Sequence, residues 1–206
     1  MDEVRNDAGL TEKEFLEQYR PSDYERPSVT VDMLVLCMSK YLDNLKVLLI
    51  QRKDHPYINC WALAGGFVGI DESAYQAACR ELREETGIES STYLEQLYTM
   101  SRPDRDPRMR VIDIAYITLM QEQPTVAGDD ARKALWFDIS LTKDFLELSN
   151  QDENIVIQYR LSKETFQNGV VRTAGYKMQP VSREKLAFDH CEIILEGLLR
   201  LRNKVT

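Results

Sequence analysis

Three glutamates in one segment have the types and spacing to do chemistry together. Glu81, Glu84 and Glu85 stand at relative positions i, i+3 and i+4, so a helix would gather their carboxylates on one face. Carboxylates this close raise each other's pKa values unless a cation lies among them. Hard oxygen ligands suit Mg²⁺ or Mn²⁺. The spacing indicates either a divalent-metal site or an ordinary solvated acidic face.

The element that must position these glutamates is a helix, and its signals are in the sequence. Nothing between Glu72 and Thr86 breaks a helix, and Gly87 stands where a left-handed C-terminal cap is needed. Small and apolar residues recur at every fourth position, which suits close packing on a sheet. They are Ala74, Ala78 and Leu82.

The offsets around this helix decide between the two interpretations of the acidic face. Gly66 is followed after five residues by Glu72, and after seven more by Arg80-Glu81-Leu82-Arg83-Glu84-Glu85-Thr86-Gly87-Ile88. Every one of these offsets matches the Nudix box. The sequence therefore resembles the Nudix hydrolase family, with Ala64 at a position where many members have proline.

The resemblance implies an α/β fold, the Nudix α/β/α sandwich with a mixed β-sheet. It also implies hydrolysis of a nucleoside diphosphate linked to another moiety, with Mg²⁺ or Mn²⁺ as cofactor. Carried over by position, the metal ligands are Glu81, Glu84, Glu85 and the carbonyl of Gly65. One of these glutamates, or a loop acid such as Asp129 or Asp130, would be the base, although a turn role suits these aspartates better. Arg80 would orient the carboxylates or serve only structurally, and Glu72 would tie the loop to the helix.

The remaining elements divide the chain into an extension and a domain. Residues 1–27 are expected to form an N-terminal extension, with a short helix that begins at a Thr11-x-x-Glu14 capping box. The expected Nudix domain covers 28–206, with strands at 28–38, 46–50, 93–100, 109–120 and 134–137, a short helix at 141–148, an extra hairpin near 155–177 that turns at Asn168-Gly169, and a C-terminal helix near 183–203. The hairpin extends a sheet or makes a subunit contact. His190, on the apolar face of the last helix, is expected to be packed.

Substrate contacts are expected from a cationic loop after the box helix. Arg102, Arg105 and Arg108 share eight residues with two prolines. The loop is either a solubilising turn or a phosphate clamp, and guanidinium groups bind phosphate oxygens bidentately. We favour the clamp and add Arg52 to it. Phe67 is the expected aromatic contact, with Tyr57 or Trp61 as further candidates that could equally be core.

Segments outside the box look like a narrower branch of the family, the ADP-ribose pyrophosphatase-like proteins and the Nudix-related transcriptional regulators of NAD metabolism. These segments are 28–32, 103–108 and 186–190. Such regulators carry a winged-helix domain after the helix equivalent to 183–203, and we expect none here because the sequence stops at Thr206. The expected function is hydrolysis of ADP-ribose to AMP and ribose 5-phosphate. The alternatives are a sensor that binds ADP-ribose without turnover and a nucleoside triphosphate pyrophosphohydrolase.

Composition narrows the expected partners. The net charge of −8 and the pI of about 4.9 argue against nucleic acid as a partner. No apolar run approaches 18 residues and no leader begins at Met1, so we expect neither a membrane span nor export. The four cysteines are scattered, as in reduced cytoplasmic proteins. We expect a cytoplasmic homodimer with a small nucleotide as substrate.

Overall fold

The computed structural model describes residues 3–38, 44–88, 94–125, 127–128, 131–168 and 171–204. In chain order its elements are α1 (Glu12–Gln18), the 3-10 helix η1 (Pro21–Asp23), β1 (Ser28–Met38), β2 (Leu45–Arg52), β3 (Trp61–Ala62), β4 (Ala64–Phe67), α2 (Ala74–Thr86), β5 (Glu95–Met100), β6 (Val111–Gln121), β7 (Ala131–Leu141), β8 (Phe145–Asn150), β9 (Ile155–Asn168), β10 (Val171–Pro180) and α3 (His190–Lys204). Three sets of predicted residues fall outside the described ones: Asp129 and Asp130, Gly169 of the hairpin turn, and Tyr93 at the start of a predicted strand.

A mixed sheet organises the domain. Its ten strands follow the order β10-β9-β8-β7-β2-β1-β6-β5, with β3 paired to β2 and β4 paired to β1. The β1–β6 pair is parallel, and the other pairings recorded in the described residues are antiparallel. The predicted mixed sheet is therefore confirmed.

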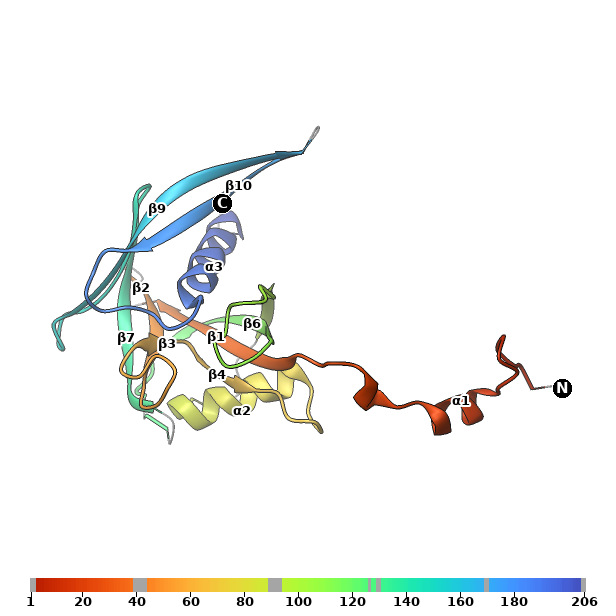
Figure 1. Ribbon diagram of the computed structural model, residues 1–206. Coiled ribbons are helices and arrows are strands. Elements are labelled where there is room, and N and C mark those ends of the chain that lie inside the picture. The colour runs from red at the N-terminus through yellow and green to blue at the C-terminus, as the bar shows by residue number, and fades with distance from the viewer. Residues whose placement is uncertain are drawn as a thin grey trace.

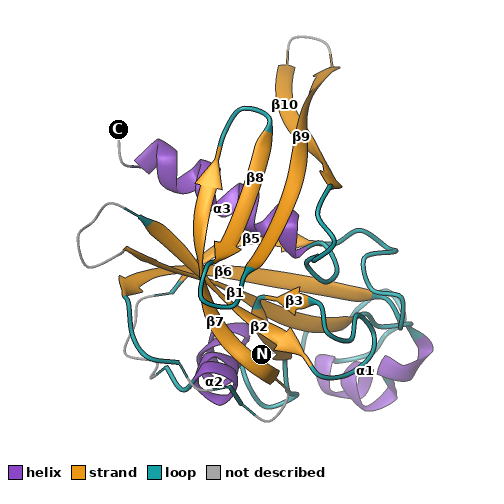
Figure 2. Cartoon of the chain, turned by 90° about the vertical axis from the view of Figure 1, so that its left-hand side faces the viewer, coloured by secondary structure: helices purple, strands orange, loops and turns teal. Residues whose placement is uncertain are grey.

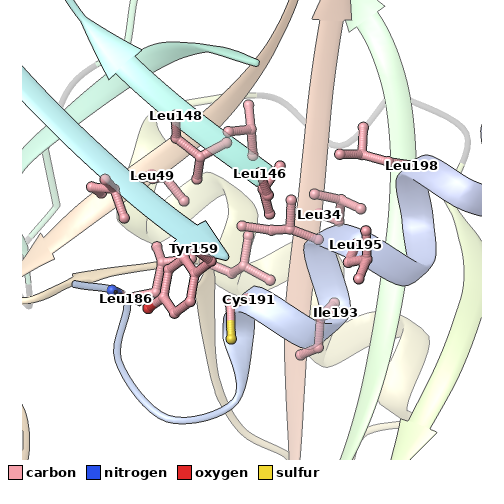
Figure 3. Packing of buried hydrophobic residues seen from close by; sticks show 14 of the residues in the cluster. Leu34, Leu49, Leu146, Leu148, Tyr159, Leu186, Cys191, Ile193, Leu195 and Leu198 are labelled. Carbon is pink, nitrogen blue, oxygen red and sulfur yellow. Dashed lines mark hydrogen bonds between the residues drawn. The ribbon is translucent and has the colours of Figure 1, made fainter. Parts of the chain in front are cut away.

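The central strand β1 shows why the fold has three layers. Its side chains alternate between two hydrophobic clusters, as the period of two in a strand requires. Val31 and Met33 pack in the cluster that contains Ala78 of α2, whereas Leu34 packs in the cluster that contains Ile193 of α3. Figures 1 and 2 show α2 and α3 on opposite faces of the sheet, and Figure 3 shows the α3 side of the core. The α/β/α arrangement is confirmed.

Several local signals are also confirmed. Thr11 closes the predicted capping box at the start of α1. The structure adds a second capping box, which Ser73 closes at the start of α2. Gly87 ends α2 with φ of 72°, the left-handed conformation that glycine adopts without steric cost. His190 is buried, and its Nδ1 accepts a hydrogen bond of 2.9 Å from the backbone N–H of Leu63.

The helix predicted at 141–148 is wrong. This segment ends β7, turns, and returns as β8. Leu146 and Leu148 are fully buried while their neighbours are half-buried, which is the alternation of a strand with one face on the core. A hydrogen bond of 2.9 Å from the Thr142 N–H to the Phe145 carbonyl closes the turn between them.

The C-terminal helix begins at His190, seven residues later than the predicted Arg183. The preceding segment is irregular and is held by a parallel bridge between Leu186 and Trp61. Trp61 donates its N–H to Lys185 at 3.1 Å, and Ala187 donates to the carbonyl of Trp61 at 2.7 Å. This pairing carries residues 188–190 to the end of β4, where the candidate site lies.

The N-terminal segment extends away from the rest of the molecule (Figure 1). None of the residues of α1 is buried. Phe15, Leu16 and Tyr24 are exposed, although Phe15 and Tyr24 both contact Tyr19. We call residues 3–27 the arm. Within the described residues, no helix combines the length and apolar character needed to span a membrane.

Candidate active site

The carboxylates predicted to bind metal meet a guanidinium group. Arg80 donates to Glu72 at 2.6 and 3.1 Å, to Glu81 at 2.6 Å and to Glu84 at 3.2 Å. It also donates to the carbonyl of Phe67 at 3.1 Å. Arg80 thus links α2 to β4 and to Glu72 in the loop before the helix. This arrangement is compatible with either predicted role, orienting the carboxylates or holding the structure together.

Glu81 and Glu85 lie against bare backbone. Glu85 accepts a hydrogen bond of 2.7 Å from the N–H of Gly65. A Cβ placed on Gly66 would stand 2.2 Å from Oε1 of Glu81, so no side chain fits there unless Glu81 moves. Glycine at this position lets the carboxylate approach the strand closely.

The electrostatics of the cluster differ from one glutamate to the next. Burial raises the pKa of Glu81, although the neighbouring Arg80 opposes this shift. Hydrogen bonds from Arg80 and from the Gly69 N–H lower the pKa of Glu72. The side chain of Glu84 is half exposed, at 51%. A cation beside the partly buried Glu81 would favour its charged form.

The donor set fits a divalent cation. Within the described residues no group of three His, Cys, Asp or Glu side chains converges ready to hold an ion, and Arg80 supplies the positive charge shared by Glu81 and Glu84. The donors are nonetheless hard oxygens, which Mg²⁺ and Mn²⁺ prefer. The carboxylate of Glu81 occupies the place that a Cβ of Gly66 would take, so it lies directly against the Gly66 backbone.

A cavity of about 290 Å³ opens beside these glycines. Of the predicted site residues it is lined by Arg52, Gly65, Phe67, Glu85, Arg105 and Arg108. The lining does not include Glu72, Arg80, Glu81, Glu84 or Arg102. The cavity is also lined by residues that the sequence analysis did not assign to the site: Asp32, Asp106, Phe188 and His190.

Arg105 is part of a buried ion-pair network. Its Nε donates to Asp189 at 3.0 Å and its Nη2 donates to the same carboxylate at 2.6 Å. Nη2 is also 3.5 Å from Asp32, and only 3% of the Arg105 side chain is exposed. Because Asp189 and Asp32 already contact this guanidinium, Arg105 ties together the segments that carry them. Direct contact of Arg105 with phosphate stays a prediction.

Arg102 and Arg108 have different surroundings. Arg102 pairs at the surface with Glu192, at 2.9 Å. Arg108 donates to both oxygens of Asp106, at 3.0 and 2.7 Å, and its guanidinium lies 5.3 Å from the centroid of the Phe67 ring. Arg108 and Phe67 thus face the cavity together.

Leu63, His190 and Asp32 line the cavity and form a network of polar contacts. This network was not predicted from the sequence. Leu63 donates to Nδ1 of His190, which leaves Nε2 to donate to Asp32, 3.3 Å away. Asp32 has a lowered pKa because His190 and Arg105 together outweigh its burial. Its neighbour Asp113 has a pKa raised well above the ordinary value, by burial first and by Asp32 second.

Of the aromatic candidates, Trp61 is core and Tyr57 lies near the cavity. Trp61 is buried and packs against Phe137, with ring centroids 4.8 Å apart. Tyr57 is partly exposed and contacts Phe188, with ring centroids 4.7 Å apart. The signal that could have found Phe188 and its neighbours was the segment 186–190, which resembles the same branch of the family as the arginine loop.

Comparisons with known proteins show what the chain is similar to. A model of the NUDIX domain matches residues 7–159. The chain is 38% identical over 150 residues to an ADP-ribose pyrophosphatase of Methanocaldococcus jannaschii, covering 73% of this chain and 82% of the relative. It is 30% identical over 196 residues to the ADPR responsive transcriptional repressor NtrR of Acinetobacter baylyi. That match covers 94% of this chain but 62% of the repressor's length.

Solved structures give the same picture. A MutT/nudix family protein from Enterococcus faecalis superposes with a TM-score of 0.78 at 40% identity, over 94% of this chain and 70% of that one. The NUDIX domain of Shewanella oneidensis NrtR, complexed with ADP ribose, gives a TM-score of 0.63 at 27% identity. It covers 93% of this chain and 99% of that domain.

Proposed function

The chain belongs to the Nudix family, and from this premise we propose that it is a divalent-metal-dependent pyrophosphohydrolase that cleaves ADP-ribose to AMP and ribose 5-phosphate. The observation that carries the proposal is the cluster of box glutamates on α2, of which Glu85 lines a cavity that also holds Arg52 and Arg108. The 38% identity to an ADP-ribose pyrophosphatase supports the substrate.

Two groups of residues have different roles in this proposal: one would bind the metal and the other the diphosphate. Glu81, Glu84 and Glu85, with the carbonyl of Gly65, would hold Mg²⁺ or Mn²⁺. When bound, the cation would neutralise diphosphate charge and make a water easier to deprotonate. Arg52 and Arg108 would grip the diphosphate through charge-assisted hydrogen bonds.

The proton and the guanidinium groups have definite places in this scheme. One box glutamate, or a loop acid, takes the proton of the attacking water while a P–O bond of the diphosphate breaks. For Glu81 and Glu84 to hold a cation, Arg80 would give up the hydrogen bonds that it donates to one oxygen of each. It would then orient the carboxylates through Glu72 and Phe67.

A substrate panel tests the proposal. Wild-type protein with Mg²⁺ is given ADP-ribose, 8-oxo-dGTP, a dinucleoside polyphosphate and NADH, and the released nucleotides are separated by chromatography. We expect the highest kcat/KM for ADP-ribose, with AMP as product and no turnover in EDTA. Faster turnover of the triphosphate would replace the substrate assignment and leave the family.

A second function is favoured by the match to the repressor NtrR, which covers 94% of this chain. In this alternative the domain binds ADP-ribose as a signal and does not hydrolyse it. The intact glutamates favour the enzyme, because a sensor has no need of all three. Calorimetry separates the two functions: a sensor binds ADP-ribose in the presence of Mg²⁺ without heat from hydrolysis and without AMP.

We further propose that the protein works as a cytoplasmic homodimer. The cysteines are free, as in a reducing compartment. The arm exposes Phe15 and Leu16 on a helix of seven residues, and helices this short are marginal alone in water. Packing of the arm on a second copy would stabilise it. Light scattering should give the mass of a dimer for the wild type and of a monomer for a Phe15→Asp, Leu16→Asp variant.

A further inference from the structure

An aromatic residue connects the two arginines of the cavity wall. The guanidinium of Arg52 lies 5.2 Å from the centroid of the Phe188 ring, and that of Arg108 lies 5.8 Å from it. These distances are within the range of a cation–π contact, in which the negative face of the ring attracts a cation. Both arginines and the ring line the same cavity.

The two guanidinium groups repel each other, and the ring lies beside both of them. Burial lowers the pKa of Arg52 and the positive charge of Arg108 lowers it further, while the carboxylates of Glu85, Asp32 and Asp106 offset part of the shift. The Nε of Arg52 donates to the carbonyl of Pro56 at 2.8 Å, which fixes one side of its plane. Two like charges held together in a partly buried wall form a site that attracts an anion with several charges.

The backbone of Phe188 indicates that its ring is needed at this place. Its φ is 48°, in the left-handed region that bulky residues rarely adopt. Tyr57, whose ring contacts Phe188, has a φ of 63°. Hydrogen bonds hold the residues on both sides of Phe188. The N–H of Ala187 donates to the carbonyl of Trp61, and Arg105 donates to the carboxylate of Asp189. Glycine would adopt the same backbone without strain.

We propose that Phe188 is a positioning residue, whose ring holds Arg52 and Arg108 together so that both guanidinium groups grip one diphosphate. The inference rests on the proposed function, because a diphosphate is the anion that this pair would receive. Phe188 acts through the arginines, so its loss weakens the grip in the ground state and in the transition state alike. Such a loss raises KM and leaves kcat almost unchanged.

The test replaces the ring while keeping the apolar volume. Phe188→Leu should raise KM for ADP-ribose by about five- to thirtyfold, the size expected for two lost cation–π contacts, with kcat within about twofold of wild type. Phe188→Tyr keeps the ring and should restore the wild-type KM. Phe145→Leu is the matched control, because Phe145 lies 5.4 Å from the guanidinium of Arg160 and outside the cavity lining. It should leave both constants unchanged.

A double-mutant cycle shows whether Phe188 acts through Arg108. In an Arg108→Gln background, Phe188→Leu should raise KM by clearly less than in the wild type, because the contact it removes is already gone. Independent effects of the two substitutions, or a Phe188→Leu enzyme no different from Phe145→Leu, would overturn the inference while the proposed function stands.

Binding of inorganic pyrophosphate, measured by calorimetry, separates the inference from the proposed function. We expect wild-type protein to bind pyrophosphate and Phe188→Leu to bind it about five- to thirtyfold more weakly. This result would hold even if ADP-ribose were not hydrolysed, in which case the proposed function alone fails. Equal binding by the wild type and Phe188→Leu, or no binding by the wild type, would overturn the grip itself.

Discussion

Two parts of the site are built in different ways: the box glutamates with Arg80, which we call the glutamate wall and of which Glu85 lines the cavity, and the buried ion pairs around Arg105, which we call the buried wall. In the glutamate wall, Arg80 contacts partners eight and four residues away in sequence, Glu72 and Glu84. In the buried wall, Arg105 meets Asp189 across 84 residues. The first wall is made by the geometry of one helix and its preceding loop, whereas the second is made by the fold.

The walls also differ in exposure. The side chains of Arg80 and Glu84 are 31% and 51% exposed, so water screens the charges that they carry. Arg105 and Asp189 are 3% and 1% exposed. The comparison indicates that the glutamate wall can rearrange around a cation at small cost in stability. The ion pair of Arg105 and Asp189 cannot rearrange in the same way, because water cannot solvate a charge that loses its partner at this buried position.

The largest expected effect breaks the glutamate wall. Glu84→Gln and Glu85→Gln should each lower kcat by orders of magnitude, because each would remove a charged ligand of the proposed metal. The melting temperature should change little, since repulsion within the patch is relieved as contacts are lost. Turnover and thermal melts of the same preparations check this. Turnover that survives both substitutions would contradict the role given to this wall.

The next effect breaks the buried pair. Asp189→Asn should destabilise the fold by about 3–5 kcal/mol, because it leaves the guanidinium of Arg105 buried without its partner's charge. The matched control is Glu192→Gln, which removes the exposed partner of Arg102 and should cost about 0–1 kcal/mol. Urea unfolding of the two variants measures the difference. Equal losses would show that burial does not separate these two ion pairs.

A smaller effect concerns Asp113, which lies beside the buried pair. Its pKa is raised by burial and by Asp32, so its neutral form is favoured in the folded state. The stability that it contributes is present at acid pH and is lost as the pH rises through the folded pKa. Asp113→Asn stays neutral, so its stability relative to wild type should increase from acid to neutral pH. Unfolding curves across this range would contradict the prediction if the difference were constant.

The glutamate wall could be predicted from the sequence because its spacing is local. The period of a helix brings Glu81, Glu84 and Glu85 together whatever the rest of the chain does, and Gly87 ends that helix as expected. The orientation of the side chains was not predictable in the same way. Arg80 lies among the carboxylates, and Glu85 turns to the Gly65 N–H.

The buried wall could not be predicted because it depends on contacts between distant segments. The Leu63 N–H meets His190 across 127 residues, and nothing in the pattern around either residue specifies the other. The same lack explains the error at 141–148, where an apolar run is compatible with a helix or with a strand until its neighbours are known. Pairing with β7 and β9 makes it a strand.

The central claim is that the box glutamates turn over the substrate while Arg52 and Arg108 hold it. The most direct measurement is calorimetric binding of ADP-ribose to a Glu84→Gln, Glu85→Gln double variant, beside its turnover in Mg²⁺. We predict that binding is kept within about tenfold of the wild-type affinity, because Arg52 and Arg108 are untouched, while production of AMP is lost. A variant that loses binding and turnover together, or one that still produces AMP, would contradict the account.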